Sequence, residues 1–407
     1  MGGVAEAGEL VNEYARLVPV FVVALVAPLL VGLMPVRSRV PQVVLLILGG
    51  VLVGPVVLQL SDPKSVTLLS DLGMGFLFLL AGYELQPHLL REPTGRRAGL
   101  AWLTSLILGA VVVLAVVGTT TPGVIAAGSI ALATTALGVL LPVLKDNGTL
   151  DSRLGRAVLV LGAFGELGPI VAMAVLLGTR SAGAATAILI AFALLAIAIA
   201  VVPSRLGGAW VSEQLERSEH GTGQSTLRLT VLLLVALLAL ADWLGFDAVL
   251  GAFVGGMVLR RWTRGNAEPL ERKLESVGWG VFIPVFFVSS GMALDVQSLL
   301  ERPLLPILFL AAMLVVRGGA VLLWLRRDLD RIELAQAALY STTTLPVLVA
   351  LTGLAVDDGA LPPNVGAAIV GAGVLSVIIL PFVAGRLSGR GAEQDFAPDG
   401  ASETGCG

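Results

Sequence analysis

The sequence predicts an all-α membrane protein that crosses the bilayer about thirteen times. Three observations predict this class: 56% of the 407 residues are hydrophobic, only 14% are charged, and the apolar residues form long uninterrupted runs. Soluble domains carry roughly 25% charged residues, so a water-soluble protein is excluded. The strands of outer-membrane barrels alternate apolar and polar residues, and these long apolar runs show no such alternation. The small net charge of −3 gives no reason to expect a nucleic-acid partner.

Each predicted span is an apolar segment close to the roughly 20 residues that cross a bilayer as a helix. The thirteen segments are 17–34, 40–60, 67–86, 99–118, 122–144, 154–177, 182–202, 226–244, 246–260, 277–296, 303–325, 332–355 and 363–385. We expect residues 1–16 to be an extracellular N-terminus and 17–386 to form the transmembrane domain. Residues 387–407 are expected to be a disordered cytoplasmic tail. The tail carries Cys406, the single cysteine, which excludes intrachain disulfides and a cysteine metal cage.

The basic residues support this number of spans and set the orientation. With the N-terminus outside, 21 of the 26 basic residues fall at the inner ends of spans or in inner loops, and only Arg16, Lys64, Arg180 and Arg302 fall outside. Cytoplasmic loops are enriched in Lys and Arg, so the bias predicts an extracellular N-terminus and a cytoplasmic C-terminus. The acidic residues before the first segment, such as Glu13, argue against a cleaved signal peptide.

Spans five and twelve share a short pattern of threonines followed by proline. Span five has Thr134 and Thr135 with Pro142 beyond them, and span twelve has Thr342, Thr343 and Thr344 before Pro346. The two spans run in opposite directions, as they would if spans one to six and eight to thirteen were inverted repeats around span seven. Because proline breaks the helical hydrogen-bond ladder, we expect two discontinuous helices meeting at one cavity. Chance similarity and ordinary kinks, with hydroxyls bonded to the preceding turn, remain alternatives.

Glu166 is the only acidic residue near the centre of a predicted span, ~18 Å from the inner edge at 1.5 Å per residue. A charge at that depth is expensive and is a functional candidate by default. Gly165 precedes it, and Pro169 leaves the Gly165 carbonyl without its helical partner. A carboxylate, a free carbonyl and the threonine hydroxyls of spans five and twelve are hard oxygen ligands, which suit Na+ or K+ better than a transition metal.

Arg317 is the one basic residue deep inside a span. It is expected to offset the negative ends of the half-helices or to form a local salt bridge, and it is a poor proton carrier because guanidinium keeps its proton. A structural ion pair with Glu166 and snorkelling of the side chain to the inner surface are the alternatives.

The chain resembles the monovalent cation:proton antiporter-2 family, bacterial sodium/proton and potassium/proton exchangers, over most of residues 17–386. Four motifs carry the resemblance: FLFLLAGYEL at 76–85, ALATTALGVLLPVLKD at 131–146, LGAFVGG at 250–256 and FIPVFFVSSG at 282–291. The resemblance implies the sodium/proton antiporter fold, with spans five and twelve as crossed discontinuous helices. It also implies a core and a dimerisation domain, a homodimer, and elevator-type alternating access.

One departure from the family pattern bears on the mechanism. Many relatives carry Asp-Asp or Asn-Asp where this sequence has Gly165 and Glu166, and paired aspartates go with electrogenic exchange in the family. The lone carboxylate therefore points to electroneutral exchange. Arg317 lies where electrogenic relatives often have lysine. The choice between Na+ and K+ stays open.

We therefore expect a secondary transporter of the cell membrane that exchanges Na+ or K+ for H+, with no cofactor and no enzymatic activity. Glu166 is the shared ion and proton site, supported by Gly165 and the threonines at 134, 135 and 342–344. The alternative is a sodium-coupled organic-anion symporter on a similar fold. A membrane sensor would be expected to bring a sizeable soluble domain, and an embedded hydrolase would need a nucleophile and base or a metal site, which this sequence does not suggest.

Overall fold

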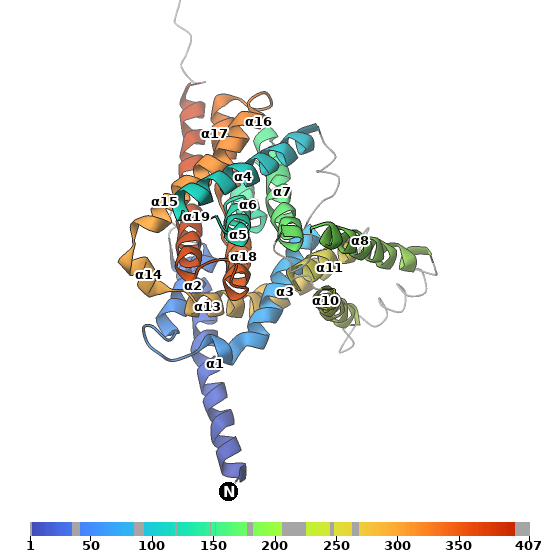
Figure 1. The fold of residues 1–407 in the computed structure, drawn as a ribbon, viewed down its shortest axis with the longest axis vertical. Helices are drawn as coiled ribbons and strands as arrows, with labels where there is room; N and C mark the ends of the chain where they lie inside the picture. Colours follow the sequence, from blue (N-terminus) through green and yellow to red (C-terminus); the bar gives the residue numbers. More distant parts are fainter. Residues whose placement is uncertain are drawn as a thin grey trace, which may run out of the picture.

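The structure is a computed structural model. It describes residues 2–34, 41–84, 93–118, 120–146, 148–150, 152–176, 182–205, 225–244, 248–262 and 268–394, and the structural statements below concern these residues. All regular elements within them are helices (Figure 1).

The helices form two groups according to their main contacts. The first group is α1 (Gly2–Leu33), α2 (Gln42–Val53), the short 3-10 helix η2 (Pro63–Val66), α3 (Thr67–Glu84), α10 (Ser225–Trp243), α11 (Ala248–Trp262), α12 (Glu268–Val277), the π-helical turn η4 (Gly278–Phe282) and α13 (Ile283–Met292). We call it the wall. Within it, α3 packs against α11 and α13, and α2 packs against α1 and α13.

The second group, which we call the crossing bundle, contains the interrupted helices. It consists of α4 (Pro93–Val117), α5 (Pro122–Leu132), α6 (Leu137–Asp146), α7 (Arg153–Leu176), α15 (Leu304–Met313), the π-helical turn η5 (Leu314–Gly318), α16 (Gly319–Leu325), α17 (Arg331–Thr342), α18 (Pro346–Asp357) and α19 (Pro363–Gln394). Helix α8 (Ala182–Arg205) contacts α7 and α11 and so joins the two groups, and α14 (Val296–Glu301) packs on α19.

Every predicted span falls on a helix, on a helix continued through a π-helical turn, or on a pair of half-helices. By length and composition, eight helices in the described part are able to cross a membrane, or nine if α17 and α18 count as one span. The all-helical membrane fold is therefore confirmed, whereas the count of thirteen stays a prediction. The predicted tail also stays a prediction: α19 continues to Gln394, and residues 395–407 lie outside the described residues.

Glycines lock the wall helices together backbone to backbone. A methyl group on Gly82 of α3 would lie 2.0 Å from the carbonyl oxygen of Phe253, and one on Gly256 of α11 would lie 2.0 Å from that of Leu79. Small residues allow such close approach of helix backbones in membranes. The same reciprocal contact joins α2 and α13, through Gly50 against Val288 and Gly291 against Ile47.

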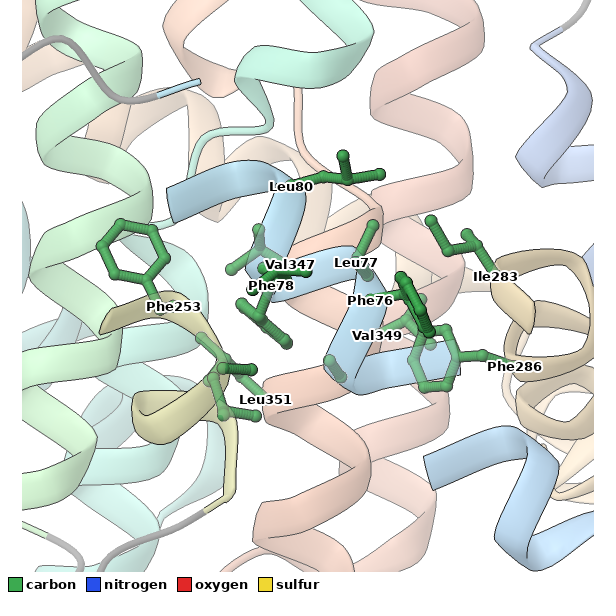
Figure 2. Close-up of a cluster of buried hydrophobic side chains, with 14 of the residues drawn as sticks. Phe76, Leu77, Phe78, Leu80, Phe253, Ile283, Phe286, Val347, Val349 and Leu351 are labelled. Atoms are coloured by element: carbon green, nitrogen blue, oxygen red, sulfur yellow. The ribbon is translucent and has the colours of Figure 1, made fainter. Parts of the chain in front are cut away.

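The wall and the crossing bundle meet at an apolar seam. Figure 2 shows Val347 and Val349 of α18 among Phe76, Phe78 and Phe286, and all five belong to one buried cluster. Burial of such side chains is worth about 1.5–3 kcal/mol each relative to exposure in water. These five side chains are hydrocarbon only, so their own contacts include no polar pairing that would fix a register.

Candidate functional site

The interruption of span five lies at residues 133–136, between α5 and α6. The prediction that Pro142 marks this break is wrong, because Pro142 lies inside α6. The helical ladder stops earlier, where Ala136 gives its N–H to the carbonyl of Thr343 at 3.0 Å instead of to its own helix. The break is therefore produced by a contact with span twelve.

The interruption of span twelve lies where the sequence predicts it. Helix α17 begins with a capping box, in which Asp330 and Glu333 satisfy free backbone N–H groups. It ends at Thr342, and α18 starts with Pro346 in its first turn, bent from α17 by 40°. Proline is tolerated there because its missing N–H would have no helical partner at the first helical position.

The two breaks pair with each other (Figure 1, at the centre of the crossing bundle). Besides the backbone bond from Ala136 to Thr343, the hydroxyls of Thr134 and Thr344 lie 2.9 Å apart, and the Thr135 hydroxyl donates to the carbonyl of Ser341 at 2.5 Å. All these threonines are buried. The backbone groups that the breaks release are thus used across the crossing, as burial requires.

Glu166 lies on α7 against this crossing, and its side chain is only 4% exposed. The N–H of Leu137, the first residue of α6, donates to its Oε1 at 2.7 Å. A helix N-terminus carries free N–H groups and a partial positive charge, so α6 stabilises negative charge on Glu166. The Gly165 carbonyl, which Pro169 cannot serve, accepts the N–H of Thr135 at 3.0 Å.

Arg317 is completely buried and lies in the π-helical turn η5. Its Nε donates to the Thr135 hydroxyl at 3.1 Å and its Nη2 donates to the Leu161 carbonyl at 2.7 Å, while Nη1 has no hydrogen-bond partner in the structure. The side chain therefore does not snorkel to the surface. It supports the crossing through Thr135 and α7, and the Glu166 carboxylate is not among its hydrogen-bond partners.

The span-twelve threonines have different environments. Thr342 donates to the Ala338 carbonyl at 2.8 Å and Thr343 to the Leu339 carbonyl at 3.1 Å, so both hydroxyls bond to the preceding turn of α17. This geometry is the ordinary one for threonine in a membrane helix. Thr344 is the span-twelve threonine whose hydroxyl contacts the break in span five, at Thr134, whereas Thr343 contacts that break through its carbonyl.

Ser376 of α19 is part of the crossing, although sequence reasoning did not select it. It is fully buried, its hydroxyl accepts the N–H of Thr344 at 3.1 Å, and it lies 2.9 Å from the Thr344 carbonyl. It therefore satisfies backbone groups that the break in span twelve releases. Its position as a polar residue near the middle of an apolar segment was the available signal.

The arrangement offers a carboxylate, hydroxyls and backbone carbonyls, which are hard oxygen ligands that suit an alkali cation. Among the described residues there is no group of three or more His, Cys, Asp or Glu side chains able to hold a metal ion. In chemical terms the site is able to hold a proton or a small cation at Glu166.

Comparison with known proteins identifies the family. The family described as "Sodium/hydrogen exchanger, transmembrane" matches residues 21–388. The chain belongs to this sodium/hydrogen exchanger family. This match confirms the family resemblance that the motifs indicate. It also confirms the prediction of a multi-pass membrane protein.

Three curated proteins are similar in sequence to this exchanger-family chain. It is 27% identical to the putative Na(+)/H(+) antiporter YjbQ of Bacillus subtilis, over 93% of this chain and 64% of that protein. It is 30% identical to cation/H(+) antiporter 17 of Arabidopsis thaliana, over 64% and 34%. It is 26% identical to the glutathione-regulated potassium-efflux system protein KefC of Escherichia coli K12, over 71% and 47%. The chain thus spans less than two thirds of each of these relatives.

The fold has a solved counterpart. The sodium proton antiporter MjNhaP1 of Methanocaldococcus jannaschii matches with a TM-score of 0.60 and 16% identity, covering 96% of this chain and 98% of that one. This likeness confirms the predicted sodium/proton antiporter fold. None of these relatives is named as an organic-anion symporter or as an enzyme, so the comparisons do not favour those alternatives.

Proposed function

We propose that the protein exchanges a monovalent cation, Na+ or K+, for H+ across the cell membrane, with Glu166 as the shared site. The observation that carries the proposal is the Glu166 carboxylate, 4% exposed and held at 2.7 Å by the first N–H of α6 beside the two paired breaks. Family membership supports the same class of transport.

In the proposed mechanism, Glu166 binds a proton or a partly dehydrated cation, one at a time. Either ligand neutralises the carboxylate, which lowers the cost of carrying the site past an apolar barrier. The empty, charged site moves poorly, and this couples the two fluxes. Gly165, Thr134, Thr135 and Thr344 provide oxygen atoms close to the crossing. The hydroxyls of Thr342 and Thr343 donate to the preceding turn and keep lone pairs that could bind a cation.

Exchange of one cation per proton is electroneutral, and we propose this stoichiometry because Glu166 has Gly165 as its neighbour instead of a second acid. We further propose elevator-type movement of the crossing bundle along the wall and a homodimeric working unit, with the N-terminus outside and the C-terminus in the cytoplasm. The apolar seam supports such movement, since hydrocarbon side chains make contacts that are not specific in register.

The deciding experiment uses purified protein in proteoliposomes with a pH-sensitive dye inside. We expect addition of Na+ or K+ to change the internal pH at starting pH values between 6 and 9. The rate should stay the same when the membrane voltage is removed by adding a permeant anion. No pH response to either ion would refute the proposal, and a voltage-dependent rate would refute its electroneutral form.

Glu166→Gln tests the proposed site. The amide oxygen of glutamine is able to accept the Leu137 N–H, so the variant should fold and exchange should be lost. Glu84→Gln, a change at a half-buried glutamate at the end of α3, is the matched control and should keep exchange. Exchange retained by Glu166→Gln would remove this residue from the mechanism.

A further inference from the structure

A cavity of about 340 Å³ lies between the wall and the crossing bundle, away from the crossing itself. Its walls come mainly from the start of α3, the end of α13, the C-terminal part of α18 and the start of α19, with further residues from η2 and α2. By the distribution of basic residues these ends face the outside of the cell. We call this space the outer cavity.

The outer cavity is acidic on both walls. Asp71 of α3 and Asp295, beyond α13, line it from the wall, and Asp357 of α18 lines it from the crossing bundle. Lys64 is the basic side chain among the lining residues, so three carboxylates face one ammonium group. Asp295 is already engaged, since it accepts the N–H of Ser298 at 3.0 Å and its hydroxyl at 2.5 Å. Asp71 and Asp357 are both exposed and line the cavity from the wall and from the crossing bundle, so a cation bound between them would offset two negative charges.

A second observation points to a ligand in the same place. Thr352 of α18 lines the outer cavity, its side chain is only 2% exposed, and its hydroxyl has no hydrogen-bond partner in the structure. A buried hydroxyl without a partner costs about 1–3 kcal/mol, and a bound cation would use its oxygen. Ser289 of α13, 7% exposed, faces the same space from the wall.

The outer cavity is separate from the site at Glu166. Its innermost residue on α18 is Val349, five residues beyond Thr344, or ~8 Å along the helix. Thr352 lies three residues further on. The residues at this inner end, Val349 and Phe286 among them, are apolar and belong to the seam (Figure 2). An ion in the outer cavity therefore has to cross a hydrocarbon contact before it reaches the crossing.

We propose that Asp71, Asp357 and Thr352 form a second, outer binding site for the transported alkali cation, which loads the exchanger from the outside. The inference rests on the proposed exchange function. Because Asp71 belongs to the wall and Asp357 and Thr352 to the crossing bundle, the site is complete only while the two groups lie as they do in this structure. The outer site thus holds a cation at the extracellular side before Glu166 receives it.

The test compares the apparent KM for the cation on the two sides of the membrane, with right-side-out and everted vesicles. Asp71→Asn and Asp357→Asn should each raise the KM for external cation about fivefold, the size of a carboxylate interaction of about 1 kcal/mol in partly solvated surroundings, and leave the internal KM unchanged. Glu301→Gln, at an exposed carboxylate that ends α14 and does not line the cavity, is the matched control and should change neither.

Thr352→Val separates a binding role from a structural one. Valine removes an unpartnered buried hydroxyl, so a merely structural threonine would give a variant of equal or higher melting temperature with an unchanged KM. We expect the external KM to rise about twofold to threefold instead, by the loss of one oxygen ligand. An unchanged KM in Thr352→Val, or effects of the two Asp→Asn variants that disappear in 0.5 M choline chloride, would overturn the site in favour of a diffuse surface field.

The outcomes for this site and for the exchange function are distinguishable. If the unmodified protein shows no exchange, the proposed function fails. If exchange proceeds and the KM values of the Asp71 and Asp357 variants stay within twofold on the outer side, or rise on the inner side, the outer site is refuted while exchange stands.

Discussion

Replacing Gly165 by alanine tests how tightly the crossing is built. A methyl group there would lie 2.4 Å from both Cβ and Oγ1 of Thr135 and 3.0 Å from Nη2 of Arg317. Ordinary contact starts at 3.4 Å, so Thr135 would have to move by about 1.0 Å. Its hydrogen bonds to Gly165, Ser341 and Arg317 do not survive such a shift in this geometry.

The magnitude follows from two contributions. Overpacking costs about 1–3 kcal/mol, and each weakened hydrogen bond costs about 1 kcal/mol. Because the contributions overlap, we expect Gly165→Ala to lower the free energy of unfolding by about 2–4 kcal/mol and to slow exchange at least about tenfold, since the carbonyl and hydroxyl beside Glu166 are displaced.

The assay is thermal unfolding in detergent together with exchange in proteoliposomes. Gly319→Ala is the control, because a methyl group at this helical glycine meets nothing within 4 Å. That change should stabilise slightly, through the better helix propensity of alanine. Equal melting temperatures and equal exchange rates for the two variants would refute the view that the crossing has no room at Gly165.

The remaining predictions concern groups that support the crossing. Arg317→Met should lower the melting temperature, because it leaves the Leu161 carbonyl without its donor at 2.7 Å. A double-mutant cycle of Arg317→Met with Thr135→Val should give a coupling energy of about 1–2 kcal/mol. A coupling energy of zero would mean that the hydrogen bond between Arg317 and Thr135 contributes nothing to stability. Ser376→Ala should lower the free energy of unfolding by about 1–2 kcal/mol and raise hydrogen exchange at the Thr344 amide, which loses its acceptor; an amide protected as before would contradict this role.

Much of the fold was predictable from the sequence because membrane helices are dictated by local composition. Apolar runs mark the helices, and the break at Pro346 follows from the chemistry of proline itself. Glu166 was selected as a candidate for a similar reason, since a lone carboxylate in an apolar segment stands out. The family match places these local signals in one fold.

The rest depends on tertiary contacts that a linear pattern does not contain. The break in span five lies at residues 133–136 because Ala136 bonds to Thr343, more than 200 residues away in the chain, whereas Pro142 is accommodated in α6. Thr342 and Thr344 are alike in sequence, but one bonds its own helix and the other faces Thr134. The hydrogen-bond partners of Arg317 likewise could not be predicted from the sequence, because they belong to α7 and to the break in span five.

The glycine contacts between α3 and α11 hold these two wall helices rigidly against each other. With Gly82 and Gly256 each leaving only 2.0 Å for an added atom against the opposite backbone, neither helix is able to rotate or tilt without steric collision. In the movement proposed above, α3 and α11 would therefore keep their positions relative to each other, and the change of shape would fall at other contacts.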